Sequence, residues 1–306
     1  MIQTGTQPGH LIDIDQLSKR EMEELFQQAD AWKNGHGMGT NVYAGRFVAN
    51  LFFEPSTRTR LSFEVAERKL GLEILQLDEM TSSVAKGESF YDTLRTLASL
   101  GVHVAVVRHS GGGLLEKMAR HSLGLALINA GEGSGGHPTQ ALLDCYTLRH
   151  HFGQLSGLRV AIVGDILHSR VARSNVLALN AFGARPVLSG PASMRDPELE
   201  SIAPYLPFEE AIGEADAVMM LRVQLERHQE TLFSSAAAYR KHYGLTLERL
   251  ERMRSHAVIL HPGPFNRGVE IDGELVEHPR SKIFEQKANG VWIRMAALQR
   301  ALEGGL

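Results

Sequence analysis

Three hydroxyl side chains and two guanidinium groups follow one another at the start of a predicted helix. The segment 56–60 reads Ser-Thr-Arg-Thr-Arg, between an apolar stretch and an amphipathic pattern. Ser56 or Thr57 can cap this helix, which leaves several first-turn N–H groups available to a ligand. Arginines in a first turn oppose the helix dipole, so two of them favour a bound anion over the alternative of two solvated side chains. The number of donors indicates phosphate rather than a single carboxylate.

A glycine-rich segment leads into a second predicted helix. Residues 131–136 satisfy G-x-G-x-x-G between a strand and a helix, the setting of a dinucleotide-binding loop. The acidic residue expected about 20 positions further on is missing, because residues 153–158 carry no carboxylate. The segment instead ends with His137 and Gln140 at the mouth of the helix. A neutral histidine there can donate to a carbonyl oxygen that gains negative charge, although a buried structural histidine is the plainer alternative.

Further cationic and polar residues lie where predicted strands end or helices begin. Ligands bind at the carboxyl ends of strands in open α/β sheets, so these positions are candidates for binding. Taken singly, each is explained equally well by solvation or a salt bridge. Together they gather more guanidinium groups at such positions than stability needs. The candidates are Arg108, Arg170, Arg222 with Gln224, the turn Pro262-Gly263-Pro264, and Ser82 with Lys86 in a polar loop.

The elements that must position these residues alternate between helix and strand for nearly the whole chain. Nearly continuous apolar strands separated by helices indicate parallel sheets covered on both faces. We therefore predict an α/β fold of two doubly wound parallel-sheet domains, and a length of 306 residues agrees with about two domains. Late in the chain we expect a helix over 245–256, a strand over 257–264 and a helical tail from about 289.

Composition and charge exclude several classes of protein. A formal net charge of -3 gives no support for a nucleic-acid partner. No apolar stretch approaches the ~18 residues of a membrane span, and residues 1–15 lack the pattern of a signal peptide. The single cysteine, Cys145, excludes an intrachain disulfide and a cysteine-built zinc site. We expect a cytoplasmic globular protein.

In their order along the chain, these motifs resemble those of the transcarbamoylase family. Residues 53–60 are similar to the family's carbamoyl-phosphate signature, and residues 137–140 to its second block. Residues 221–224 and 261–268 indicate the aspartate branch, because the ornithine branch carries a His-Cys-Leu-Pro block at the latter place. The resemblance runs from about residue 45 to about residue 295.

The resemblance implies transfer of a carbamoyl group from carbamoyl phosphate to the α-amine of L-aspartate, a step of pyrimidine biosynthesis, with no cofactor and no metal. It implies a carbamoyl-phosphate-binding domain over 1–152, on which the C-terminal helix 289–306 packs back. An aspartate-binding domain covers 153–288, and the active site lies in the cleft between the two domains.

The resemblance also divides the carbamoyl-phosphate contacts among candidate residues. Four of them hold the phosphate: Ser56, Thr57, Arg58 and Thr59. Arg108 bridges the phosphate and the carbamoyl oxygen, to which Thr59 and His137 also donate. The carbamoyl NH₂ is received by Gln140 and by the backbone carbonyls of Gly263 and Pro264. The residues expected to act in catalysis are Arg58, Thr59, Arg108 and His137.

The remaining implied contacts concern aspartate and a second subunit. Arg170 and Arg222, helped by Gln224, would bind the two aspartate carboxylates. Ser82 and Lys86 would come from a neighbouring subunit, so that a homotrimer shares its active sites. A regulatory or dihydroorotase-like partner chain can dock on such a trimer without leaving a sign in this sequence.

Three other functions remain open on the sequence. A transcarbamoylase acting on ornithine or another amine is the nearest alternative. A nicotinamide-dependent dehydrogenase rests on the glycine pattern alone, and a non-enzymatic phosphate sensor or scaffold would keep the anion sites without chemistry. The chain has no nucleophile elbow, no HExxH and no G-x-x-x-x-G-K-[ST] loop.

Overall fold

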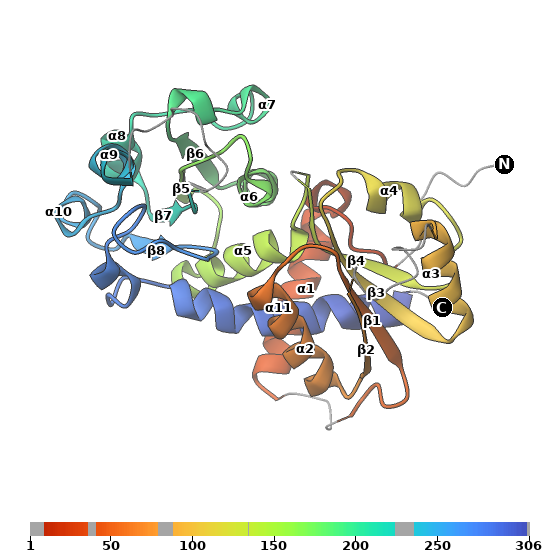
Figure 1. Cartoon of the computed structure of the whole chain (residues 1–306). Coiled ribbons are helices and arrows are strands. Elements are labelled where there is room, and N and C mark those ends of the chain that lie inside the picture. The colour runs from red at the N-terminus through yellow and green to blue at the C-terminus, as the bar shows by residue number, and fades with distance from the viewer. Residues whose placement is uncertain (1–8, 36–40, 79–87, 134, 224–235, 305–306) are drawn as a thin grey trace. The chain divides into compact units, whose positions relative to one another are not determined.

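The chain folds into two compact α/β units, as the alternating pattern predicts. The computed structural model describes residues 9–35, 41–78, 88–133, 135–223 and 236–304. The first unit comprises Met1–Leu142 and Asn289–Leu306, and the second comprises Leu143–Ala288. Within the described residues, each unit contains a four-stranded sheet whose strands all run parallel (Figure 1).

The first unit is built on a sheet of strand order β2-β1-β3-β4. Its strands are β1 (Phe47–Phe52), β2 (Glu73–Asp78), β3 (Val102–His109) and β4 (Ala126–Glu132). Its helical segments are η1 (Ile14–Gln16), α1 (Lys19–Lys33), α2 (Thr57–Leu70), α3 (Phe90–Ser99) and α4 (Leu114–Ala119). Two longer helices, α5 (Pro138–Phe152) and α11 (Ile283–Gly304), contribute residues to both units.

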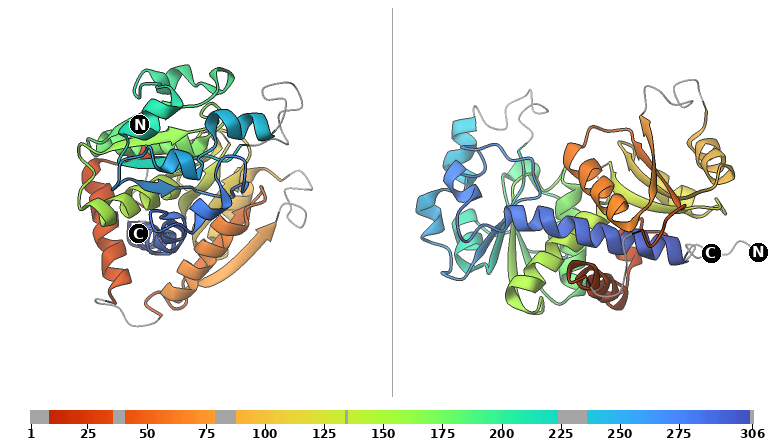
Figure 2. Two further views of the ribbon diagram at one scale, coloured as in Figure 1. Left: turned by 90° about the vertical axis from the view of Figure 1, so that its left-hand side faces the viewer. Right: turned by 90° about the horizontal axis from the view of Figure 1, so that it is seen from below.

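Alternation of side chains along the strands gives this sheet two different faces. One face packs on α3 and α4 in an apolar cluster that includes Leu51, Val107, Leu127, Leu94 and Leu115. The opposite face of β1 carries Asn50, which donates a 2.8 Å hydrogen bond to Glu67 of α2. Helices therefore cover both faces, and the first turn of α2 lies at the edge where β1 ends (Figures 1 and 2).

The second unit repeats this plan with strand order β6-β5-β7-β8. Its strands are β5 (Arg159–Val163), β6 (Arg185–Ser189), β7 (Ala217–Met220) and β8 (Val258–Leu260). Its helical segments are α6 (Arg170–Ala181), η4 (Ala192–Met194), α7 (Pro197–Glu200), α8 (Phe208–Glu214), α9 (Ala236–Tyr243), α10 (Leu247–Leu250) and η5 (Gly273–Val276). Strand residues such as Val163, Val218 and Ile259 form one apolar cluster with Phe208 and Ile212 of α8.

The helix predicted over 245–256 is wrong in its length, since α10 ends at Leu250. The Arg280 guanidinium accounts for the early end, because it donates to the carbonyls of Leu250 (3.2 Å) and Ala257 (2.7 Å) and also to that of Arg254. A distant side chain thus holds the Leu250 carbonyl, which a longer helix would pair with the N–H of residue 254. The predicted strand over 257–264 is shorter for a similar reason, as β8 ends where the His261 ring accepts the Gly263 N–H (2.9 Å).

The C-terminal helix begins earlier than expected. We predicted a start near residue 289, whereas α11 begins at Ile283, whose side chain is buried in the core of the second unit. None of the helices in the described ranges has the length and apolar character needed to cross a membrane.

The Asn50–Glu67 pair leads to a prediction about pH and stability. Glu67 is fully buried, and burial raises its pKa to about 7 against the opposing effect of the Asn50 hydrogen bond. A raised carboxyl pKa means that the folded state holds the proton more tightly, so stability falls as pH rises from about 4.5 to about 7. Glu67→Gln should therefore match the wild type near pH 5 and exceed its free energy of unfolding by up to about 3 kcal/mol near pH 8.

Urea unfolding at the two pH values measures this difference. The matched control is Glu64→Gln, on the same helix, where a partly exposed carboxylate pairs with Arg68 at 2.9 Å. The control should show no such pH-dependent gain. An equal difference for both variants at the two pH values would contradict the assignment to Glu67.

Candidate functional site

The candidate residues of the first unit meet at the carboxyl edge of its sheet. β3 lies between β1 and β4, and all three run parallel. Phe52 is in register with Arg108, and the Phe53 N–H donates to the Arg108 carbonyl at 2.9 Å. Because strands are spaced about 4.8 Å apart, the ends of β1 and β4 are about 10 Å from each other. The start of α2, Arg108 and the start of α5 therefore border one small region.

The mouth of α2 differs from those of three other helices that begin after a serine, α1, α3 and α6. Ser56 is in the N-cap position, but its side chain makes no capping hydrogen bond with the described residues. By contrast, Ser18, Ser89 and Ser169 each accept an N–H at the start of α1, α3 and α6. The Ser56 hydroxyl and the first-turn N–H groups of α2 are thus oriented for another acceptor or anion. The neighbouring Thr59 is buried.

Arg108 is held at this edge by its neighbours on both sides. Its Nε lies 3.4 Å from an Oε of Glu54, which follows β1, and an Nη donates to the carbonyl of Ala130 in β4 at 3.1 Å. The side chain is only 12% exposed. Contacts to both flanking strands hold the guanidinium over the end of β3, where it can meet a ligand bound at α2. Glu54 was not among our candidate residues, although it lies within the segment 53–60 that we singled out.

His137 and Gln140 lie together at the start of α5. The His137 carbonyl accepts the N–H groups of Gln140 (3.0 Å) and Ala141 (3.2 Å), and both side chains are buried. Gly136 has a packing explanation, because a Cβ at this position would lie 2.7 Å from the Asp13 carboxylate. Close approach of the Asp13 side chain therefore accounts for this glycine without a dinucleotide.

The second unit repeats this arrangement at the carboxyl edge of its own sheet. β5, β7 and β8 are neighbours, and each is followed by a candidate. Arg170 begins α6, whose N-cap Ser169 accepts the Ala172 N–H at 3.1 Å. Arg222 comes two residues after β7, and the Gly263-Pro264 turn follows β8 with Gly263 at a φ of 73°.

Three candidates lie outside the described residues. These are Ser82, Lys86 and Gln224. The described candidates divide between the two units. Those of the first unit are Ser56, Thr57, Arg58, Thr59, Arg108, His137 and Gln140. Those of the second unit are Arg170, Arg222, Gly263 and Pro264.

Comparison with known proteins decides the family. A sequence model described as the carbamoyl-P binding domain of aspartate/ornithine carbamoyltransferase matches residues 9–150. A second, described as the Asp/Orn binding domain of the same enzymes, matches residues 156–300. The chain belongs to the aspartate/ornithine carbamoyltransferase family. The group at the mouth of α2 falls within the first matched segment, and the two arginines at strand ends of the second unit fall within the other.

Solved structures of aspartate transcarbamoylases resemble this carbamoyltransferase over nearly its whole length. The Trypanosoma cruzi enzyme in complex with carbamoyl phosphate and aspartate is 27% identical, with a TM-score of 0.84, and the match covers 97% of this chain and 98% of that chain. The same enzyme in complex with carbamoyl aspartate and phosphate is 28% identical, with a TM-score of 0.84 and coverage of 97% and 96%. The catalytic subunit of M. jannaschii aspartate transcarbamoylase is 32% identical, with a TM-score of 0.84 and coverage of 96% and 98%.

Within the described part of the chain, neither the cysteine thiol nor a metal site offers a competing chemistry. Burial raises the pKa of the Cys145 thiol, so the thiolate that a nucleophile requires is not formed near neutral pH. Among the residues that the structure describes, no group of three or more His, Cys, Asp or Glu side chains could hold a metal ion.

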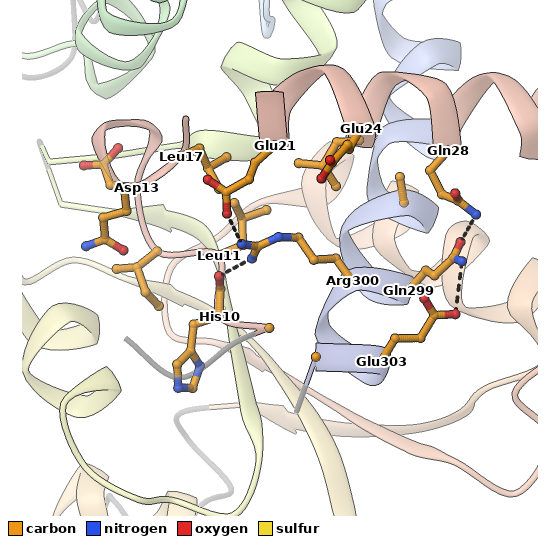
Figure 3. Close-up of a pocket in the computed structure, with 16 residues that line it drawn as sticks. His10, Leu11, Asp13, Leu17, Glu21, Glu24, Gln28, Gln299, Arg300 and Glu303 are labelled. Carbon is orange, nitrogen blue, oxygen red and sulfur yellow. Dashed lines mark hydrogen bonds and ion pairs between the residues drawn. The ribbon is translucent and has the colours of Figure 1, made fainter. Parts of the chain in front are cut away.

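A hollow of about 560 Å³ lies elsewhere in the first unit, among the N-terminal segment, α1 and α11, and none of the candidate residues lines it. Figure 3 shows that several of its polar side chains, among them Arg300 and Gln299, are paired with groups on the facing elements. Arg300 donates to Glu21 (2.9 Å) and to the His10 carbonyl (2.7 Å), while Gln299 donates to Glu303 (3.1 Å). These bonds fasten α11 to the start of the chain, which is a structural role.

The contrast between capped and uncapped helix mouths yields a second prediction. Ser169→Ala removes a bonded N-cap and should lower the free energy of unfolding by about 1 kcal/mol. Ser56→Ala removes a hydroxyl without a capping bond and should change it by less than about 0.5 kcal/mol. Added phosphate should raise the melting temperatures of the wild type and of Ser169→Ala by the same amount. The rise for Ser56→Ala should be smaller. Equal destabilisation in phosphate-free buffer would show that Ser56 acts as an ordinary cap.

Proposed function

We propose that this carbamoyltransferase transfers the carbamoyl group of carbamoyl phosphate to the α-amine of L-aspartate, giving N-carbamoyl-L-aspartate and phosphate. The observation that carries the proposal is the uncapped mouth of α2, which lies at the same sheet edge as Arg108 and His137. The T. cruzi enzyme crystallised with carbamoyl phosphate and aspartate supports the same pair of substrates here. The reaction is a step of pyrimidine biosynthesis.

Carbamoyl phosphate is assigned to the first unit. The phosphate accepts hydrogen bonds from the first turn of α2 and from the side chains of Ser56, Thr57, Arg58 and Thr59. Arg108 bridges the phosphate and the carbamoyl oxygen, and its contacts to Glu54 and Ala130 pre-orient it for this task. Thr59 and His137 complete the donors to that oxygen, and Gln140 accepts from the carbamoyl NH₂.

Aspartate is assigned to the second unit. Arg170 and Arg222 bind the two carboxylates, with help from Gln224, and planar guanidinium groups suit this because they bind carboxylates in a bidentate manner. The carbonyls of Gly263 and Pro264 receive the carbamoyl NH₂. We assign the first substrate to a domain of residues 1–152 with 289–306, the second to a domain of residues 153–288, and the active site to the cleft between them.

The proposed mechanism needs no covalent intermediate. The deprotonated amine of aspartate attacks the carbamoyl carbon, and negative charge builds on the carbonyl oxygen. When the bond to phosphate breaks, this charge moves to the departing phosphate and the carbonyl is restored. Preorganised donors at that oxygen stabilise the transition state, and the alignment of two bound substrates reduces the entropic cost. The departing phosphate accepts the amine proton. A side-chain carboxylate or neutral lysine within hydrogen-bond reach of the amine in a bisubstrate-analogue complex would contradict that assignment.

The proposed active unit is a cytoplasmic homotrimer. Ser82 and Lys86 of one subunit complete the site of the next, which makes each active site a shared one. A regulatory or dihydroorotase-like subunit is a further partner that such a trimer can accept.

One assay tests the proposed function directly. Phosphate release from carbamoyl phosphate should depend on added L-aspartate and should not be supported by ornithine. Release with ornithine instead would favour the other branch of the family. Binding of NAD measured by calorimetry would favour a dehydrogenase, and phosphate binding without transfer to any amine would favour a sensor.

Two arginine variants should separate the roles of the two substrate groups. Arg58→Ala should lower kcat by roughly 10²–10⁴ because a donor to the transition state is worth about 2.7–4 kcal/mol or somewhat more. Arg222→Ala should mainly raise the KM for aspartate. The matched control is Arg68→Ala in the last turn of α2, where the side chain is exposed and pairs with Glu64. Near-normal turnover of Arg58→Ala would remove Arg58 from the mechanism.

Subunit mixing tests the shared site. Lys86→Ala and Arg58→Ala should each be nearly inactive alone. In hybrid trimers some sites receive both wild-type residues, so activity should return after the two variants exchange subunits. Exchange verified by mass spectrometry without any recovery would show that Lys86 does not complete a neighbour's site.

A further inference from the structure

A fully buried carboxylate, Glu270, lies among the strand-end loops of the second unit. Its side chain is 0% exposed, and its oxygens face donors from two residues of the loop that follows β8, Asn266 and His261. The Asn266 N–H donates a short hydrogen bond to Oε1, and the Asn266 side-chain amide donates to Oε2 at 3.3 Å. The His261 Nε2 lies 3.4 Å from Oε1. A buried charge is stable only when such donors surround it.

The contact with His261 connects Glu270 to the turn that follows β8. His261 Nδ1 accepts the Gly263 N–H at 2.9 Å, so this nitrogen carries no proton. The ring proton is therefore on Nε2, the nitrogen that faces Glu270. A negative charge on Glu270 favours this tautomer, and the tautomer in turn holds the Gly263-Pro264 turn by its first N–H.

The contact with Asn266 connects Glu270 to the segment that follows β7. The Asn266 side-chain amide donates to the Val223 carbonyl at 3.1 Å as well as to Glu270. Val223 is the residue after Arg222. One carboxylate thus orients the amide that holds the backbone next to a proposed aspartate ligand.

Buried hydrogen bonds continue from His261 toward the helix that begins with Arg170. The His261 N–H donates to Gln286 (2.8 Å), and the Gln286 amide donates to Asp144 (2.8 Å). Asp144 also accepts from Asn175 of α6 at 2.9 Å. All four side chains are fully or almost fully buried. Buried hydrogen bonds therefore connect the end of β8 with α11, α5 and α6.

We infer that Glu270 is a positioning residue for the aspartate half of the site, which it serves by locking the segments after β7 and β8 against each other. This inference rests on the proposed function, because it concerns the residues that bind aspartate and the carbamoyl NH₂. The carboxylate is needed specifically because both of its oxygens are acceptors, which suits the two Asn266 donors and the nearby His261 Nε2. A glutamine in its place would turn one NH₂ group toward either Asn266 or His261, where donor would face donor.

Glu270→Gln tests the inference with a change in chemistry and almost none in size. We expect the KM for aspartate to rise about tenfold or more and kcat to fall, because small displacements of positioning groups have large kinetic effects. The Kd for carbamoyl phosphate, whose proposed ligands lie at the sheet edge of the first unit, should remain within about twofold. A merely structural role would lower the melting temperature without this division between the two substrates.

The chain offers a matched control at the other end of β7. Asp216 accepts the Arg159 N–H (2.9 Å) and side-chain bonds from Arg254 and His256 (2.8 Å each). Like Glu270 it binds a backbone N–H and faces a histidine, but it precedes β7 while the proposed aspartate ligand follows that strand. Asp216→Asn should lower the melting temperature and leave the KM for aspartate unchanged.

A second variant keeps the inference testable if Glu270→Gln does not fold. Asn266→Ala keeps the carboxylate and removes the bond to Val223, so it should raise the KM for aspartate severalfold in a folded enzyme. Two results would overturn the inference. One is a folded Glu270→Gln enzyme whose KM for aspartate equals that of the Asp216→Asn control. The other is an Asn266→Ala enzyme whose KM for aspartate is unchanged from the wild type. Absence of aspartate-dependent phosphate release by the wild type would instead overturn the proposed function, so the two failures are distinguishable.

Discussion

The common direction of the strands is the constraint on which the candidate site depends. In a parallel sheet every strand ends at the same edge, so segments far apart in sequence are brought together there. In the first unit this edge collects the mouth of α2, Arg108 and the start of α5, although they are separated by about 80 residues from first to last. The second unit applies the same rule to Arg170, Arg222 and the turn after β8. If one strand ran in the reverse direction, its last residue would lie at the opposite edge of the sheet, away from the other strand ends.

Buried carboxylates complement this arrangement, because each fixes a donor side chain that joins two segments. Glu67 links α2 to β1 through Asn50, while Asp144 joins α5, α6 and α11 through Asn175 and Gln286. Glu270 orients Asn266, whose side-chain amide joins the loop after β8 to Val223 after β7. Apolar packing holds helices on a sheet with little preference for exact register, whereas a buried carboxylate tolerates only the register that satisfies it. The polar interior therefore fixes the positions of loops that apolar contacts alone would leave loosely defined.

The serines at the starts of the helices have two different roles, one in stability and one in ligand binding. Serines at the starts of α1, α3 and α6 satisfy first-turn N–H groups and so contribute to stability. Ser56 occupies the same position in α2 but forms no such bond among the described residues. The same residue type thus serves two purposes, and only the geometry of the turn distinguishes them. The first turn of α2 also carries Arg58 and Arg60, which is consistent with a bound anion.

Much of the architecture was accessible from the sequence because its signals are local. Apolar strands alternating with amphipathic helices predicted two parallel α/β sheets, and the segments 56–60 and 137–140 marked the helix mouths now found at one sheet edge. Errors arose where side chains bond to the backbone in ways that hydrophobic periodicity does not register. Arg280 ends α10 early by a contact with a residue far away in sequence, whereas the His261 ring ends β8 early by a contact only two residues along the chain. Glu270 escaped notice because a lone acidic residue between Val269 and Ile271 reads as one exposed position of a strand.

The sequence by itself determined which chemistry is available, since residue types and their place after strands need only short-range information. The tertiary structure alone decided which serine is left uncapped, how Arg108 is held between two strands, and which buried carboxylate ties the strand-end loops together. Arg108 is held by a residue 22 positions away, and the Asn266 amide that Glu270 orients bonds a residue 43 positions away. Such contacts form only when the whole sheet has assembled, so no window of sequence contains them.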